Sequence, residues 1–198
     1  MSLWIRQWMD LVGLTLAEHK TEAVLITSQQ NVETITLHVG NYEITSQPSL
    51  RYLQVMIDTR LSFKQQVEYV GAKASGVGTV LSWLMPYIGG PKQKRRTLLS
   101  SVVMSVLIYG ISIWAHVLLI QYARRKVASV NRLSALGVAS AFCRVSEDAV
   151  CVIAGMLPIG ILAEERRCLY LRKRLTTQSA AELRTDERDK SLHRWQLL

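Results

Sequence analysis

The sequence predicts an α+β protein, in which a small antiparallel palm-type sheet with one flanking helix precedes an all-helical, thumb-like module. Short stretches of alternating apolar residues lie before residue 63, and long apolar stripes at helical spacing follow it. The charge divides at the same place. Residues 1–63 hold 4 Lys/Arg and 6 Asp/Glu, whereas residues 64–198 hold 20 and 9. We therefore expect three parts, which are 1–62, 63–175 and a polar tail or connector at 176–198.

The first part reads as one helix followed by short strands. Apolar residues between 4 and 12 recur on one helical face, and Gly13 is suited to end that helix. The β-branched run 23–26 predicts a short buried strand. Residues 34–44 alternate on either side of Gly40-Asn41, which is typical of a hairpin with a two-residue turn.

Residues 51–63 form the junction between the sheet and the helices. The alternation from 52 to 57 predicts one half-buried strand. Ser62 and Gln65 then form an S-x-x-Q capping box, which predicts that a helix begins at about Phe63.

Apolar stripes predict the remaining helices. One ends at Pro86, one begins near Pro91, one spans 124–141, and a short one lies between Ser146 and Gly155. The last begins at Pro158, and polar residues of mixed charge follow residue 176.

Residues 97–123 contain no formally charged side chain. This length passes the test for a membrane span, which needs roughly 20 apolar residues. Polar side chains are spread along the segment, and basic flanks at both ends give no orientation bias. The pattern favours a core helix surrounded by other helices, and a protein anchored in a membrane through 97–123 is the less favoured alternative.

The excess of basic residues in the second part indicates a polyanionic partner, most often a nucleic acid. Cations at the start of a helix are disfavoured by its dipole, so an external anion would relieve their repulsion. A solvated run of charges explains such a cluster equally well. The candidate nucleic-acid-binding residues form two clusters: Lys92, Lys94, Arg95 and Arg96, and then Arg124, Arg125 and Lys126.

The sequence lacks several motifs that carry chemistry. It has no Walker loop, no G-x-G-x-x-G, no H-E-x-x-H and no G-x-S-x-G. Cys143, Cys151 and Cys168 lack C-x-x-C spacing, which predicts reduced thiols in an intracellular protein of the nucleus or cytoplasm. We predict neither a metal site nor a cofactor for this chain.

Five groups of residues nevertheless occur in a distinctive order. They are Gly13-Leu14-Thr15-Leu16…Lys20-Thr21-Glu22, Leu50-Arg51-Tyr52-Leu53-Gln54-Val55…Asp58…Leu61-Ser62-Phe63, Leu84-Met85-Pro86…Gly89-Gly90-Pro91, Leu107-Ile108-Tyr109-Gly110…Trp114 and Val145-Ser146-Glu147-Asp148-Ala149…Ala154-Gly155…Pro158-Ile159. Over residues 4–174, their order and spacing resemble the later motifs of non-LTR (LINE-type) retrotransposon reverse transcriptases.

The resemblance implies roles for several residues. Lys20 matches a lysine near the incoming nucleotide, so it is a candidate general acid that would neutralise or protonate the pyrophosphate leaving group. Tyr52, Leu53 and Gln54 match the primer grip, although the family usually has glycine where Gln54 stands. The helices after Phe63 would be the thumb, which lies along the template–primer duplex through phosphate contacts.

The resemblance also implies a limit. In that family the catalytic aspartate pair lies just upstream of where this chain begins, and two-metal phosphoryl transfer requires such carboxylates. We therefore expect a fragment of an RNA-directed DNA polymerase (a nucleotidyltransferase of a transposable element) that is inactive alone. Its expected partners are the RNA template, the DNA primer and the missing upstream part, with Mg²⁺ in the intact parent and no membrane. The alternative is a basic helical module that binds nucleic acid without a polymerase role.

Overall fold

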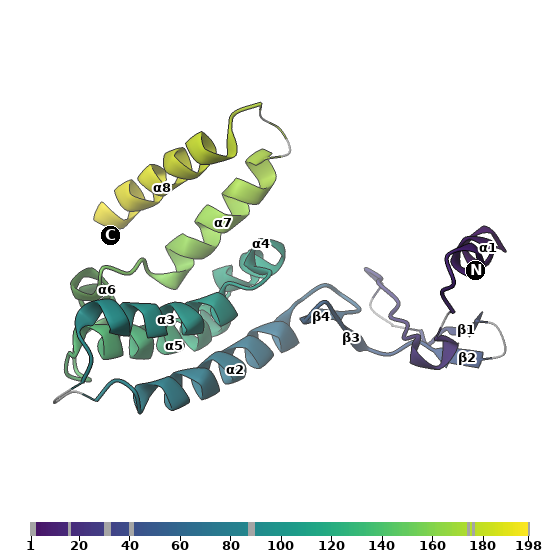
Figure 1. Cartoon of the computed structure of the whole chain (residues 1–198), viewed down its shortest axis with the longest axis horizontal. Coiled ribbons are helices and arrows are strands. Elements are labelled where there is room, and N and C mark those ends of the chain that lie inside the picture. The colour runs from purple at the N-terminus through teal and green to yellow at the C-terminus, as the bar shows by residue number, and fades with distance from the viewer. Residues whose placement is uncertain are drawn as a thin grey trace. The chain divides into compact units, whose positions relative to one another are not determined.

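The computed structural model describes residues 3–15, 17–29, 33–39, 42–86, 90–173, 175 and 177–197. They form two compact units, Met1–Phe63 and Lys64–Leu198 (Figure 1). The described strands lie in the first unit and pair antiparallel, and the second unit is helical, so the predicted α+β class is confirmed.

Two separate hairpins, rather than one small sheet, carry the described strands of the first unit. The hairpin of β1 and β2 pairs Thr36 with Thr45 and Val39 with Tyr42, as the alternation predicted, and its turn residues Gly40-Asn41 lie outside the described residues. The elements of this unit are α1 (Leu3–Leu11), the 3₁₀ turn η1 (Glu18–Lys20), β1 (Thr36–Val39), β2 (Tyr42–Thr45), β3 (Ser49–Tyr52) and β4 (Val55–Asp58).

The prediction of one strand over 52–57 was wrong. Strand β3 ends at Tyr52, β4 begins at Val55, and these two residues are partners across a two-residue turn. The turn residues Leu53 and Gln54 have φ angles of 46° and 67°. Positive φ at both central positions is the feature of a type I′ turn, which usually contains asparagine or glycine. The sequence has neither, and apolar residues continue across the turn, so the pattern looked uninterrupted.

The run 23–26 was predicted as a buried strand, and the structure corrects this too. Its residues are half-buried or exposed, and the run is held by a single bridge between Val24 and Gln47. The amide of Gln47 donates to the carbonyl of Ala23 at 2.8 Å. An isolated bridge does not make a strand, so the apolar run alone did not decide how its backbone pairs.

Asp58 binds the two amides directly before α2. Its carboxylate accepts from the backbone N–H of Ser62 at 3.0 Å and of Phe63 at 2.8 Å. Burial acts to raise the pKa of Asp58, but the hydrogen bonds from Phe63 and Ser62 outweigh it and lower the pKa. The helix begins at Lys64, one residue after the predicted start.

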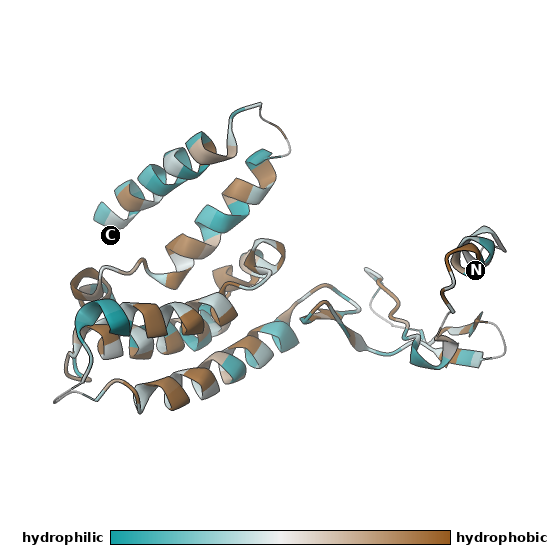
Figure 2. Ribbon diagram, in the orientation of Figure 1, coloured by the Kyte–Doolittle hydropathy of each residue, from teal (hydrophilic) through white to brown (hydrophobic). Residues whose placement is uncertain are grey.

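The second unit is built on α2, α3 and α5, which pack against one another. Figure 2 shows apolar and polar residues interspersed along these helices. Their buried apolar side chains include Val67, Val70, Val103, Leu107 and Val127. The elements are α2 (Lys64–Ser82), α3 (Gln93–Leu107), α4 (Ile111–Trp114), the 3₁₀ helix η2 (Ala115–Leu119), α5 (Gln121–Ala139), α6 (Glu147–Ala154), α7 (Ile159–Lys173) and α8 (Ala180–Gln196).

The uncharged segment 97–123 is divided among several elements instead of forming one core helix. Helix α3 ends at Leu107, and Gly110, with φ of 62°, precedes α4. Trp114 is fully buried, and its Nε1 donates to the carbonyl of Tyr109 at 3.1 Å. Within the described residues, no single helix passes the length and hydropathy test for a membrane span. Residues 93–107 and 111–119 pass it only as a pair, bent by 52°.

Arg96 ties α3 to the loop after α2 and to the end of α5. It is only 5% exposed. Its guanidinium donates to the carbonyls of Pro91 at 2.8 Å, Pro86 at 2.6 Å, Gly137 at 3.1 Å and Met85 at 3.4 Å. The carbonyls beyond the C-terminal end of α2 and in the last turn of α5 lie where the helix dipoles are negative. The buried charge is therefore matched by oriented acceptors.

The loop before α3 also requires Gly90. A Cβ atom at this position would lie 2.2 Å from the carbonyl oxygen of Pro86 and 2.6 Å from a guanidinium nitrogen of Arg96. Both distances are too short for any side chain, so glycine lets the backbone approach the arginine cage closely.

Helix α8 occupies much of the segment that we predicted as a polar tail or connector. Ser179 and Glu182 form a capping box at its start. Leu183 is buried, and Trp195 packs against the core cluster of α5 and α6. The sequence did not predict this helix, because only a few apolar residues pack it against the rest of the unit and they form no clear stripe.

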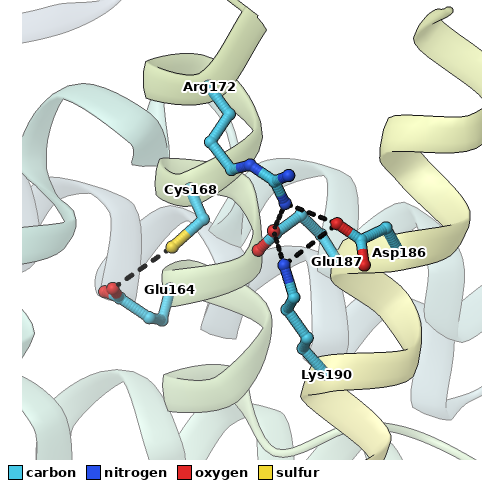
Figure 3. Close-up of polar contacts among 6 residues, drawn as sticks. All are labelled: Glu164, Cys168, Arg172, Asp186, Glu187 and Lys190. Atoms are coloured by element: carbon cyan, nitrogen blue, oxygen red, sulfur yellow. Dashed lines mark hydrogen bonds and ion pairs between the residues drawn. The ribbon is translucent and has the colours of Figure 1, made fainter. Parts of the chain in front are cut away.

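Ion pairs supply the rest of the contact between α7 and α8 (Figure 3). Arg172 of α7 donates to Asp186 at 2.6 Å and also to Glu187. Lys190 donates to the same two carboxylates, at 2.9 Å and 3.1 Å. Beside this group, Arg188 of α8 lies 3.2 Å from the buried Glu165 of α7. The α7–α8 contact therefore combines ion pairs with apolar packing.

We expect Arg96→Ala to lower the free energy of unfolding by at least about 3 kcal/mol, because it leaves several buried carbonyls without a donor. The exposed neighbour Arg95→Ala is the matched control and is expected to stay within about 0.5 kcal/mol of the parent chain. Urea unfolding followed by circular dichroism measures both. Equal effects of the two substitutions would contradict the structural role of Arg96.

The α7–α8 contact should weaken in acid. Hydrogen bonds from Arg172 and Lys190 lower the pKa of Asp186. Burial raises that of Glu187, but the same two partners outweigh it and lower the pKa. Because both folded-state pKa values lie below their unfolded values of about 4, the stabilisation is complete above that pH and is lost as pH falls through the folded values.

The variant Glu187→Gln is expected to cost about 1–3 kcal/mol near neutral pH. It should also lose less stability than the parent chain between pH 6 and pH 3, since part of the titrating contact is already gone. Urea midpoints across this range test the difference, with the exposed Asp189→Asn on the same helix as the control. A parallel pH profile for parent and Glu187→Gln would argue against the ionic contact.

Candidate nucleic-acid interface

The proposed grip residues lie at the tip of the β3–β4 hairpin. Tyr52 is 61% exposed, Leu53 is 70% exposed, and Gln54 is also exposed. The guanidinium of Arg51 donates to the side-chain oxygen of Gln54 across the turn. Strand pairing thus presents an aromatic and an aliphatic side chain outward on a short, fixed turn.

The positive φ of Gln54 gives a local reason for the glycine that the resembled family has at this position. A left-handed conformation costs a residue with a Cβ atom roughly 1–2 kcal/mol, and glycine avoids this cost. This requirement comes from the turn itself and holds without any bound ligand.

Lys20 is the last residue of η1 and is exposed. Its amide donates to the carbonyl of Ala17 at 3.0 Å, so the turn fixes its backbone. Within the described part of the chain, no carboxylate forms an ion pair with its ammonium group. A free ammonium on a short turn has the chemistry that a phosphate partner requires.

At the start of α3, three of the four predicted cations face solvent. Lys92, Lys94 and Arg95 are exposed, and no described carboxylate lies within ion-pair distance of them. Arg96 points inward and is bound to carbonyls, so the structure separates it from its neighbours. A signal for this was present in the sequence, because Arg96 lies at helical spacing from the buried Ser100, Val103 and Leu107, whereas Arg95 lies about 100° further round the helix.

The second cluster, at the start of α5, is partly neutralised. Lys126 lies 2.8 Å from Glu68 of α2, and the hydroxyl of Tyr122 donates to the same carboxylate. These two hydrogen bonds lower the pKa of Glu68. Arg124 and Arg125 are both exposed, and Arg124 also lines an open cavity together with Glu147.

The two clusters lie at opposite ends of α5. Arg96 contacts Gly137 near the end of this helix, while Arg124 is in its first turns. Thirteen residues of helix separate these positions by about 20 Å. That distance corresponds to roughly six base pairs of a duplex. The clusters are therefore not one patch, and together they suit a long polyanion better than a small ligand.

Metal-ligating side chains and thiols are further groups of chemical interest among the described residues. The described residues contain no group of three or more His, Cys, Asp or Glu side chains that would hold a metal ion. Burial raises the pKa of Cys151 to about 11 and, with the hydrogen bond to Glu164, also raises the pKa of Cys168. Both thiols therefore stay protonated near neutral pH.

Comparison with known proteins shows that the chain is related to proteins of non-LTR retrotransposons, as the motifs predicted. It is 25% identical over 191 residues to the Retrovirus-related Pol polyprotein from type-1 retrotransposable element R1 of Nasonia vitripennis, which covers 93% of this chain and 54% of that protein. It is also 25% identical over 171 residues to the Putative 115 kDa protein in type-1 retrotransposable element R1DM of Drosophila melanogaster, covering 86% of this chain and 17% of that protein.

The chain thus spans about half the length of the first relative and about a sixth of the second. No protein-family model matches the chain. No solved structure matches it either.

The hairpin tip yields a test of its own. Gln54→Gly is expected to stabilise the β3–β4 hairpin by about 0.5–1 kcal/mol, because glycine adopts the positive φ without strain. Gln54→Ala is the control, since it also removes the bond to Arg51 but keeps a Cβ atom. Hydrogen–deuterium exchange over residues 49–58 should slow in the glycine variant and quicken in the alanine variant. The same change in both would show that φ is not limiting.

Proposed function

We propose that this chain is a fragment of the RNA-directed DNA polymerase of a non-LTR retrotransposable element. In this proposal the β3–β4 hairpin contributes the primer grip, and the helices from α2 onward form a thumb that binds the template–primer duplex. The relationship to R1 proteins over most of the chain supports the first statement. The observation that carries the second is the group of exposed cations at the start of α3, for which the described part of the chain offers no ion-pair partner.

The physical basis is phosphate contact. Lys92, Lys94 and Arg95 project from the first turns of α3, where the positive helix dipole also favours anions. Contacts of this kind position a duplex without reading its sequence, as a polymerase requires. The rigid cage around Arg96 fixes the direction of this helix, so the cations are held rather than mobile on a loop.

The catalytic part of the proposal concerns residues before the helical unit and carboxylates of the parent protein. Lys20 would act as a general acid toward the pyrophosphate leaving group, and Tyr52, Leu53 and Gln54 would hold the primer end. The carboxylates and the Mg²⁺ ions would come from the upstream part of the polymerase. The purified chain is therefore expected to bind template–primer and to extend no primer.

The triple variant Lys92→Gln, Lys94→Gln, Arg95→Gln tests the thumb proposal. With a labelled RNA–DNA hybrid, we expect at least a tenfold weaker affinity near 0.1 M salt. We also expect the salt dependence (the slope of log K against log salt) to fall by about 1 for each lost phosphate contact. Fluorescence anisotropy over a salt series measures both.

The matched control replaces three other exposed cations of the same unit, Lys64→Gln, Lys73→Gln and Arg144→Gln. It changes the net charge equally but leaves the start of α3 intact. If the control weakens binding as much as the α3 variant, the binding is a general effect of charge and the proposed interface is wrong. Primer extension by the purified chain would contradict the expected inactivity.

A further inference from the structure

A cavity of about 590 Å³ lies among α4, α7 and α8, beside the ionic contact that holds α8. Three cations line it, Arg166 and Lys173 from α7 and Arg184 from α8, and its lining includes no carboxylate. The wall also contains the aromatic ring of Tyr170 and apolar side chains such as Ile111.

The charges around this cavity differ from those of the rest of the α7–α8 contact. Elsewhere between these helices, Arg172, Arg188 and Lys190 are each bound to an acidic side chain. By contrast, within the described part of the chain no acidic group forms an ion pair with Arg166, Lys173 or Arg184. Acidic side chains thus neutralise the cations within the α7–α8 contact, whereas the three cations around the cavity are not neutralised by any described acidic group.

The geometry suits an extended anion. Arg166 and Lys173 are seven residues apart, which places them on the same face of α7 about 10 Å from each other along its axis. Arg184 faces the cavity from the second turn of α8, and Ala180 of the first turn also lines it. The positive end of the α8 dipole adds to the attraction for an anion.

The apolar wall narrows the class of ligand. Tyr170 is 49% exposed, so its ring is accessible from the cavity side of α7. A cationic groove with an aromatic side chain is the combination that binds single-stranded nucleic acid, in which phosphates meet the cations and a base stacks on the ring. A cavity of this size admits one or two nucleotides, whereas a duplex is too wide to enter it.

We propose that the α4–α7–α8 cavity is a binding site for a single-stranded segment of nucleic acid, with Arg166, Lys173 and Arg184 on the phosphates and Tyr170 against a base. The site deepens the proposed function and rests on it, because an unpaired template strand accompanies every template–primer duplex. It lies on different residues from the duplex-binding cluster of α3, so the two kinds of binding are separable.

The test compares a labelled ten-nucleotide single-stranded RNA, the DNA of the same sequence and a blunt RNA–DNA hybrid on the full chain. In the variant Arg166→Gln, Lys173→Gln, Arg184→Gln, we expect single-strand affinity to fall at least tenfold and hybrid affinity to change less than twofold. The salt slope for the single strand should fall by about 2, from the loss of three phosphate contacts. The Lys64, Lys73 and Arg144 variant is the charge-matched control.

A second variant, Tyr170→Leu, keeps every charge. It is expected to weaken single-strand binding about threefold to tenfold by removing the stacking surface, while the salt slope stays unchanged. Hydrogen–deuterium exchange over 180–196 checks that α8 remains docked in both variants. Relative affinity for RNA and DNA then identifies which strand the cavity prefers.

Three outcomes overturn the inference. The first is undiminished single-strand binding in the cavity variant, and the second is an equal loss of single-strand affinity in the charge-matched control. The third is found with two further probes: the cavity variant loses affinity for anionic lipid vesicles or for a polyglutamate peptide but not for the single strand. Failure of the proposed thumb function gives a different pattern. In that case hybrid binding does not depend on the start of α3, while single-strand binding still depends on the cavity. The cavity is then the binding site of a nucleic-acid-binding module without a polymerase role.

Discussion

The buried guanidinium of Arg96 is the interaction on which the helical unit depends. It joins the loop after α2, the start of α3 and the end of α5 through carbonyl oxygens of all three segments. Removing a buried charge from water is costly unless each donor finds an acceptor, and this cage supplies them. The same cage requires Gly90, since any side chain there would displace it. Because Arg96 points inward, Lys92, Lys94 and Arg95 are held at the outer rim of the core.

A second constraint operates at the end of the chain, where α8 is held on α7 by paired charges. Surface ion pairs are individually weak, but here Glu165 and Glu187 are buried, and Glu187 shares Arg172 and Lys190 with Asp186. Docking of α8 also creates the wall from which Arg184 faces the cavity. The stability of this contact and the proposed single-strand site are therefore linked. A change that releases α8 should abolish the site even when its three cations are intact.

Local patterns predicted those elements whose signals are local. The hairpin of β1 and β2, the Ser146 cap of α6 and the stop at Gly155 follow from turn and cap residues, and the structure confirms them. Leu133 continues the apolar stripe of Val127 and Val130 in α5 and yet is 61% exposed, because one helical stripe cannot show which side a neighbour covers. The direction of Arg96 depends on carbonyls in a neighbouring loop and on Gly137, 41 residues away, and α8 docks through partners such as Arg172, 15 residues from Glu187. The turn at Leu53-Gln54 was missed for the opposite reason, since its residues lack the usual turn chemistry.

The cations of the helical unit fall into three classes according to what an incoming phosphate must displace. Arg96 cannot be recruited, because leaving its cage would strand several buried carbonyls. Lys126 pairs with Glu68 on the surface, where solvent and salt screen the contact, so a phosphate is able to compete for it. The cations of the α3 rim and of the cavity have no such competitor within the described residues. Net charge alone therefore overstates the surface on which a nucleic acid would bind, and the pairing of each cation decides where it would lie.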